Sequence, residues 1–202
     1  MTKIKLCGLS RPCDIEAANV LQPEYIGFVL APKSRRYVSP EQAAALKCLL
    51  DTRIKAVGVF VNERPETAAR LLNKGIIDMA QLHGNEDEAY IRKLRTLTDK
   101  PIIQAFRIGT RQDVIAAGES SADYVLLDSG AGTGAVFDWK LVQSFHRPYF
   151  LAGGLGVDNV EAAVRQLRPY VVDVSSGIET NGLKDKEKMA AFAAAVRKEE
   201  RL

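Results

Sequence analysis

Three features of membrane or secreted proteins are missing from this sequence. It has no apolar run near the roughly 20 residues that span a bilayer, and no apolar signal segment before its first strand-like run. It also lacks the even number of cysteines that a set of disulfides needs, since it has 3. We therefore expect a cytoplasmic protein with free thiols and no membrane partner.

An excess of one charge sign is also missing. The sequence has 28 basic and 25 acidic residues, a formal net charge of +3 that is too small and too dispersed for a nucleic-acid surface. Low-complexity stretches and long linkers are absent as well. No nucleic-acid partner is expected, and anionic small molecules stay open as ligands. The 202 residues, 47% of them hydrophobic, suffice for one core, so we expect a single domain over residues 1–202.

Short apolar, β-branched segments alternate with helical segments along the chain. Strands are predicted over residues 4–7, 25–30, 56–61, 79–83, 102–108, 124–128, 149–152 and 171–175. Two of the intervening helices begin with a proline, Pro40 and Pro65, which suits a first helical turn. A last helix, over residues 186–199, has one apolar face.

This alternation requires parallel strand pairing, which leaves a closed barrel or an open doubly wound sheet. An open sheet that binds a dinucleotide would show a Gly-rich fingerprint after its first strand, where this chain has Cys7-Gly8-Leu9. The strand count and the compact length favour a (β/α)8 TIM barrel. In such barrels the chemistry gathers at the carboxyl ends of the strands, so polar residues at those ends are the candidates.

The three cysteines differ in position. Cys13 and Cys48 fall within predicted helices, where we expect inert structural residues. Cys7 ends the first strand immediately before Gly8. It is either another inert buried thiol or a base, and a thiol with a pKa of about 8.5 needs nearby cations or backbone dipoles to act as a base at neutral pH.

Asp128 ends an apolar strand and precedes the glycine-rich residues 129–134, which can close over a substrate. Its alternative role is a loop cap that accepts backbone hydrogen bonds. Asp138 has the position of a helix N-cap.

Two further strand ends carry basic or titratable side chains. His83 has no second histidine or carboxylate at ligand spacing, so we expect no metal there, and either substrate contact or a local structural role. Arg35 and Arg36 lie in the loop after the second strand. They are either an exposed charge pair or, with an anionic substrate, its recognition groups.

Glycine-rich loops follow the last two strands. One contains Gly153 and Gly154, and the other contains Ser175, Ser176 and Gly177. Each alone fits an ordinary tight turn, but loops after strands seven and eight of a barrel are a recurrent phosphate site.

Together these motifs resemble the phosphoribosylanthranilate isomerase family over nearly the whole chain, in order. The matching segments are Lys5-Leu6-Cys7-Gly8-Leu9, Gly27-Phe28, Pro32-Lys33-Ser34-Arg35-Arg36-Tyr37, Gly58-Val59-Phe60-Val61-Asn62, Gln81-Leu82-His83-Gly84, Leu127-Asp128, Gly132-Thr133-Gly134, Phe137-Asp138-Trp139, Ala152-Gly153-Gly154-Leu155 and Asp173-Val174-Ser175-Ser176-Gly177-Ile178-Glu179. Ala131 and Asn181 stand where the family often has glycine and proline.

The resemblance implies an Amadori rearrangement in tryptophan biosynthesis, without cofactor or metal. It implies Asp128 as the acid that opens the ribose ring and Cys7 as the base that removes the C2 proton. It further implies that Arg36 holds the anthranilate carboxylate, that Asp173 contacts ribose hydroxyls, and that the two glycine-rich loops hold the phosphate.

Three rival functions stay open at this point. The first is a phosphosugar isomerase of histidine biosynthesis, a group whose members have an Asp/Asp pair where this chain has Cys and Asp. The second is a phosphate-binding barrel without turnover, and the third is a thiol-dependent acyl transferase with Cys7 as nucleophile. We expect a monomer, because no apolar stripe stands out beyond those that cover the barrel.

Overall fold

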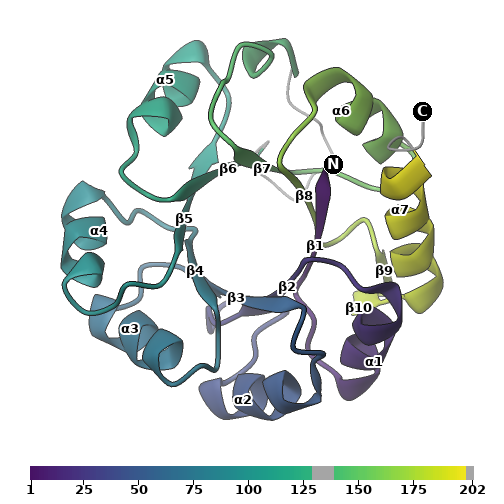
Figure 1. The fold of residues 1–202 in the computed structure, drawn as a ribbon, viewed down its shortest axis with the longest axis horizontal. Helices are drawn as coiled ribbons and strands as arrows, with labels where there is room; N and C mark the ends of the chain where they lie inside the picture. Colours follow the sequence, from purple (N-terminus) through teal and green to yellow (C-terminus); the bar gives the residue numbers. More distant parts are fainter. Residues whose placement is uncertain (129–138, 199–202) are drawn as a thin grey trace.

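The computed structural model describes residues 1–128 and 139–198, in which eight parallel strands close into a barrel surrounded by helices (Figure 1). The strands are β1 (Lys3–Cys7), β2 (Tyr25–Val29), β3 (Lys55–Phe60), β4 (Met79–Leu82), β5 (Ile102–Arg107), β6 (Tyr124–Asp128), β7 (Tyr149–Ala152) and β8 (Val171–Val174). Each pairs with its sequence neighbours, and β1 pairs with β8 to close the ring. The predicted (β/α)8 TIM barrel is therefore confirmed.

Helices follow most strands and cover the outside of the barrel (Figure 1). They are α1 (Pro12–Leu21), α2 (Pro40–Leu49), α3 (Pro65–Asn73), α4 (Glu88–Arg95), α5 (Arg111–Glu119), the 3-10 helix η1 (Trp139–Leu141), α6 (Val160–Leu167) and α7 (Lys186–Lys198). A hairpin of two short strands, β9 (Glu179–Thr180) and β10 (Leu183–Lys184), lies between β8 and α7.

The predicted strand ends agree with the structure to within one residue. The prolines begin α2 and α3 as expected, and Ser39 caps α2 by accepting a hydrogen bond from the backbone N–H of Gln42. After β7, α6 begins at Val160, with Asn159 as its N-cap. The β9–β10 hairpin was not predicted.

The cysteine prediction was partly wrong. Cys13 and Cys48 lie in α1 and α2 as expected, but both are exposed, so neither is a core residue. In α1 the buried face carries Asp14, Ile15 and Ala18, which leaves Cys13 on the solvent side. Helical position alone gave no information on which face of the helix the thiol would occupy.

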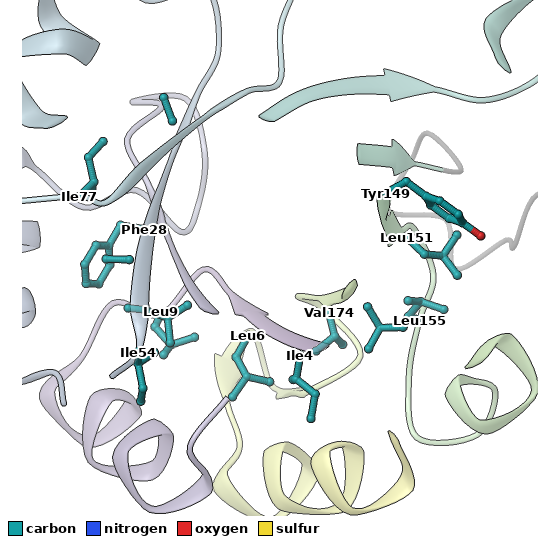
Figure 2. Packing of buried hydrophobic residues seen from close by; sticks show 14 of the residues in the cluster. Ile4, Leu6, Leu9, Phe28, Ile54, Ile77, Tyr149, Leu151, Leu155 and Val174 are labelled. Atoms are coloured by element: carbon teal, nitrogen blue, oxygen red, sulfur yellow. The ribbon is translucent and has the colours of Figure 1, made fainter. Parts of the chain in front are cut away.

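Side chains alternate between the two faces of the barrel strands. One set, including Ile4, Leu6, Phe28, Leu151 and Val174, points outward and forms the main buried cluster with the helices (Figure 2). The other set fills the barrel interior.

Aromatic rings fill the amino-terminal end of the interior. The ring centroids of Tyr25 and Phe150 lie 5.5 Å apart, and Tyr124 stacks on Tyr170 at 5.6 Å. The buried polar side chains of the barrel come from β1, β4, β5 and β8, and Lys5 of β1 is fully buried. Within the described residues, no helix is both long and apolar enough to cross a membrane.

Candidate active site

The Cys7 thiol lies at the carboxyl end of β1 and is buried. Its neighbour across the β1–β2 pair is Gly27, and a Cβ atom at Gly27 would lie 2.6 Å from the Cys7 sulfur. Glycine is thus needed on β2 to leave room for the thiol. Cys7 alone of the three cysteines is buried.

Two cations and one carboxylate act on Cys7. Burial raises the pKa of the thiol, Lys5 and Lys184 lower it, and Asp173 raises it, with a net rise above the ordinary value. Lys5 donates a hydrogen bond to Asp173 with a distance of 2.8 Å between Lys5 Nζ and Asp173 Oδ2. The nearby cations expected from the sequence are present, but burial outweighs them in the free protein.

Asp128, at the end of β6, faces His83, which follows β4. The distance from His83 Nε2 to Asp128 Oδ2 is 3.3 Å, and His83 Nδ1 lies 2.8 Å from Gln81 Nε2. With the amide nitrogen of Gln81 donating to Nδ1, the ring proton lies on Nε2, toward Asp128. The contact that the structure shows for His83 is with Asp128, and substrate contact and a local structural role both stay predictions.

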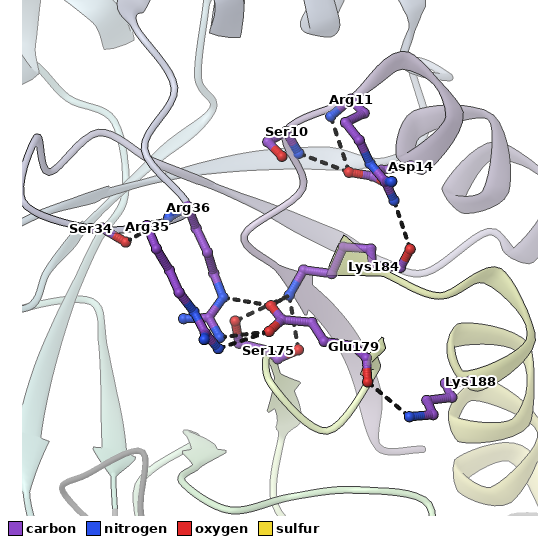
Figure 3. A network of polar contacts seen from close by, with 10 residues as sticks. All are labelled: Ser10, Arg11, Asp14, Ser34, Arg35, Arg36, Ser175, Glu179, Lys184 and Lys188. Carbon is purple, nitrogen blue, oxygen red and sulfur yellow. Dashed lines mark hydrogen bonds and ion pairs between the residues drawn. The ribbon is translucent and has the colours of Figure 1, made fainter. Parts of the chain in front are cut away.

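Arg36 reaches from the loop after β2 to Glu179 in β9 (Figure 3). Arg36 Nε lies 2.6 Å from Glu179 Oε1, and Arg36 Nη2 lies 2.9 Å from Oε2. Arg35 joins the same carboxylate at 3.0 Å, but 63% of its side chain is exposed, against 21% for Arg36. The two arginines therefore share a partner and differ in burial.

The two glycine-rich loops lie side by side, since Gly156 and Gly177 form a parallel bridge. Gly153 and Gly154 have φ angles of 89° and 65°, a region that favours glycine. A Cβ atom at Gly177 would lie 2.1 Å from the carbonyl oxygen of Leu155, so only glycine permits this approach of the loops. Loops after β7 and β8 that meet in this way match the predicted location of an anion site.

All predicted site residues thus lie at the carboxyl-terminal end of the barrel or in the loops that follow it. The structure pairs Asp128 with His83, and Asp173 with Lys5, whereas Arg36 pairs with a residue that the sequence did not single out. The glycine-rich segment over residues 129–134 and the N-cap expected at position 138 lie outside the described residues.

Sequence reasoning missed four polar partners in this region: Lys5, Gln81, Glu179 and Lys184. Lys5 and Gln81 could have been found, because each lies two residues before a candidate on the same strand and therefore on the same face. The hairpin residues offered no comparable signal, since β9 and β10 are too short for a pattern to emerge.

A closed parallel barrel with ionisable side chains and two glycine-rich loops at the carboxyl ends of its strands has the general architecture of TIM-barrel enzymes. The chain belongs to the N-(5'-phosphoribosyl)anthranilate isomerase family, whose model matches residues 4–195.

Individual relatives agree over almost their full length. The chain is 43% identical over 194 residues to the N-(5'-phosphoribosyl)anthranilate isomerase of Endomicrobium trichonymphae, with 94% of this chain and 95% of the relative covered. It superposes on the phosphoribosyl anthranilate isomerase of Thermotoga maritima with a TM-score of 0.89 at 33% identity, covering 98% and 100% of the chains. A family structure in complex with reduced 1-(o-carboxyphenylamino)-1-deoxyribulose 5-phosphate gives a TM-score of 0.88 at 33% identity, with 98% and 100% covered.

Proposed function

We propose that this protein converts N-(5'-phosphoribosyl)anthranilate into 1-(o-carboxyphenylamino)-1-deoxyribulose 5-phosphate in tryptophan biosynthesis. The reaction is an aldose–ketose isomerisation, an intramolecular oxidoreduction. The observation that carries this proposal is the family match over residues 4–195, which spans the carboxyl ends of all eight barrel strands.

Asp128 is proposed as the general acid, which protonates the ribose ring oxygen so that the aminoaldose opens to a Schiff base. Its contact with His83 supports this role. Once Asp128 has given up its proton, the N–H on His83 Nε2 donates to the resulting carboxylate and stabilises it.

Cys7 is proposed as the general base, which removes the C2 proton of the Schiff base. The electron pair of the C–H bond forms the C1–C2 double bond of an enolamine, while the C1–N double-bond pair moves to nitrogen. The enolamine then takes a proton at C1 and loses the proton of its C2 hydroxyl, which gives the ketone. C2 is oxidised and C1 is reduced, so the substrate is its own oxidant. Lys5 and Lys184 support the thiolate, since both lower the pKa of Cys7.

Three groups are proposed to bind the substrate. Arg36 takes the anthranilate carboxylate, and the backbone around Gly153, Gly154, Ser175, Ser176 and Gly177 takes the phosphate. Asp173 is proposed for the ribose hydroxyls: its Oδ2 accepts from Lys5, whereas its buried Oδ1 has no hydrogen-bond partner among the described residues. A buried unpartnered acceptor is costly and suits a hydroxyl donor from a ligand.

A non-catalytic phosphate-binding barrel is the second candidate, because the adjoining glycine-rich loops alone would bind an anion. Turnover distinguishes the two. Phosphoribosylanthranilate is generated in situ and the loss of anthranilate-type fluorescence is followed for wild type, Cys7→Ser and Asp128→Asn, with Cys13→Ser as the matched control on the exposed face of α1.

We expect wild type and Cys13→Ser to turn over alike, and Cys7→Ser and Asp128→Asn each to lose about a hundredfold or more, the usual contribution of such groups. Binding of substrate by wild type without its consumption would favour the second candidate. Activity of Cys7→Ser equal to wild type would remove the thiol from the mechanism.

We also propose that the protein acts as a monomer in the cytoplasm. The three free cysteines fit a reducing compartment. Sedimentation at micromolar concentration tests the oligomeric state directly, and a dimer mass would overturn the monomer.

A further inference from the structure

A single carboxylate, that of Glu179, accepts hydrogen bonds from three cationic side chains (Figure 3). Arg36 donates through Nε and Nη2, Arg35 through Nη2, and Lys184 through Nζ, with a distance of 2.6 Å between Lys184 Nζ and Glu179 Oε1. Only 5% of the Glu179 side chain is exposed. One negative charge thus faces three positive charges, so this cluster keeps an excess of positive charge beside the proposed anion loops.

The hydrogen bonds leave one edge of Arg36 unused. A guanidinium has five N–H donors, and Glu179 takes one from Nε and one from Nη2. The remaining edge, formed by Nη1 and the second N–H of Nη2, has no acceptor among the described residues. That edge is the fork that binds a carboxylate with two parallel hydrogen bonds.

The stem of Arg36 lies beside the proposed base. A Cβ atom at Gly8 would lie 2.6 Å from Arg36 Cδ, and Gly8 directly follows Cys7 at the end of β1. A ligand carboxylate held on the free edge would therefore be bound close to the group proposed to remove the proton.

Lys184 is occupied and serves as an anchor. Its three N–H donors go to the backbone oxygen of Ser175 at 2.8 Å, to Ser175 Oγ at 3.2 Å and to Glu179 Oε1 at 2.6 Å. Lysine has no further donor to give a ligand. Lys184 instead connects Glu179 to Ser175 in the loop after β8, and these hydrogen bonds fix the position of the Glu179 carboxylate.

We propose that Glu179 is a positioning residue that sets substrate affinity by fixing the Nε/Nη2 edge of Arg36, so that the opposite edge presents a preformed fork to the substrate's aromatic carboxylate. This inference rests on the proposed function, because that substrate supplies the carboxylate. A side chain held in advance loses less conformational freedom when ligand binds, which raises affinity without a new contact.

If Glu179 played the opposite role, the expected change in substrate affinity would have the opposite sign. If Glu179 instead competed with the substrate for Arg36, its removal would free the guanidinium and tighten binding. The sign of the change in affinity therefore tests the inference, with Glu179→Gln as the perturbation and Arg35→Gln as the control that alters the same cluster at an exposed position.

Two readouts are needed: KM and kcat for turnover, and the dissociation constant for the reduced product analogue that a family structure contains, measured by calorimetry. For Glu179→Gln we expect KM and the dissociation constant to rise roughly tenfold, with kcat falling less than about twofold, as for a contact equally strong in ground and transition states. Arg35→Gln should change both constants by less than about twofold.

A double-mutant cycle shows whether Glu179 acts through Arg36. In an Arg36→Met background, Glu179→Gln should cause no further loss of analogue affinity, because there is no guanidinium left to position. An equal loss in both backgrounds would overturn the inference, as would unchanged or tighter binding by Glu179→Gln in the native background.

Glu179→Asp is the control for a folding defect in Glu179→Gln. It keeps the negative charge among the three cations but shortens the side chain by one methylene, so it cannot keep both contacts to Arg36 and that to Lys184. We expect folded protein with weakened analogue binding, and wild-type affinity in this variant would overturn the inference. Failure of the proposed function looks different, because wild type itself would then not consume the substrate.

Discussion

Acid unfolding offers a quantitative test of the Glu179 cluster. Burial by itself raises the pKa of Glu179, but hydrogen bonds from Arg36 and Lys184 outweigh it and lower the pKa from 4.5 to about 2. Because the pKa is lower in the folded protein, the ionised group stabilises the fold fully above pH 4.5. That stabilisation is lost as pH falls from 4.5 to about 2.

The difference between 4.5 and about 2 corresponds to about 3 kcal/mol. Water around the exposed end of Arg35 screens part of the attraction, so a measured contribution of about 2 kcal/mol is the better expectation. Glu179→Gln cannot titrate and should lack this pH-dependent component.

The assay is urea unfolding followed by far-UV circular dichroism, at intervals between pH 7 and pH 2, for wild type and Glu179→Gln. The free energy of unfolding of wild type minus that of the variant should be constant above about pH 5 and should shrink by about 2 kcal/mol at lower pH. A difference that stays constant down to pH 2 would show that the cluster does not depress the pKa of Glu179, and the electrostatic reasoning would be refuted.

Three further predictions concern the proposed acid and base. Lys5→Met removes a charge that lowers the pKa of Cys7, so the rising limb of kcat/KM against pH should move to higher pH, and a profile at or below the wild-type position would contradict this. Gln81→Leu removes the donor to His83 Nδ1, so the 15N chemical shifts of this imidazole, one of 2 in the chain, should change from those of the Nε2–H tautomer to those of a mixture of tautomers. We expect kcat to fall about tenfold. Unchanged 15N shifts would show that Gln81 does not set the tautomer of His83. Gly27→Ala places a Cβ 2.6 Å from the thiol, so turnover should fall by about a hundredfold while circular dichroism stays native, and undiminished turnover would show that the thiol position is not critical.

Most of the fold could be predicted from the sequence because each strand is a short apolar segment between clear turn signals. The strand ends then placed Cys7, His83 and Asp128 at one end of the barrel, since parallel strands in a ring all present their carboxyl ends to the same side. The strand ends do not reveal which side chains touch, because the contact between His83 and Asp128 joins strands that are not neighbours.

The role of Lys5 shows why pattern reading fell short. The alternation in Lys3-Ile4-Lys5-Leu6 is typical of a strand with one face toward water. In a barrel the outward face is covered by helices, so Ile4 and Leu6 pack there and Lys5 points into the interior, where it is fully buried. The pattern does have a polar face, but this face points into the barrel interior and not to bulk solvent.

The placement of Glu179 depended on distant contacts. Its carboxylate is held by Lys184 across the short hairpin, and by Arg36 from a loop 143 residues earlier in the chain. Neither partner lies at a spacing that a strand or helix period would reveal. From the sequence alone, Glu179 therefore looks like an ordinary charged residue of a loop.

The interior of the barrel changes from aromatic to charged side chains along its axis, and burying the charged side chains costs free energy. Aromatic rings fill the amino-terminal end, whereas a buried ion pair, Lys5 with Asp173, lies beneath the thiol. A well-packed apolar pair at such a position is often as stable as an ion pair or more stable, because two charges must be desolvated. Stability alone therefore does not account for Lys5 and Asp173. Lys5 lowers the pKa of Cys7, whereas burial and Asp173 raise it, so the pair acts on the proposed base as well as on the fold.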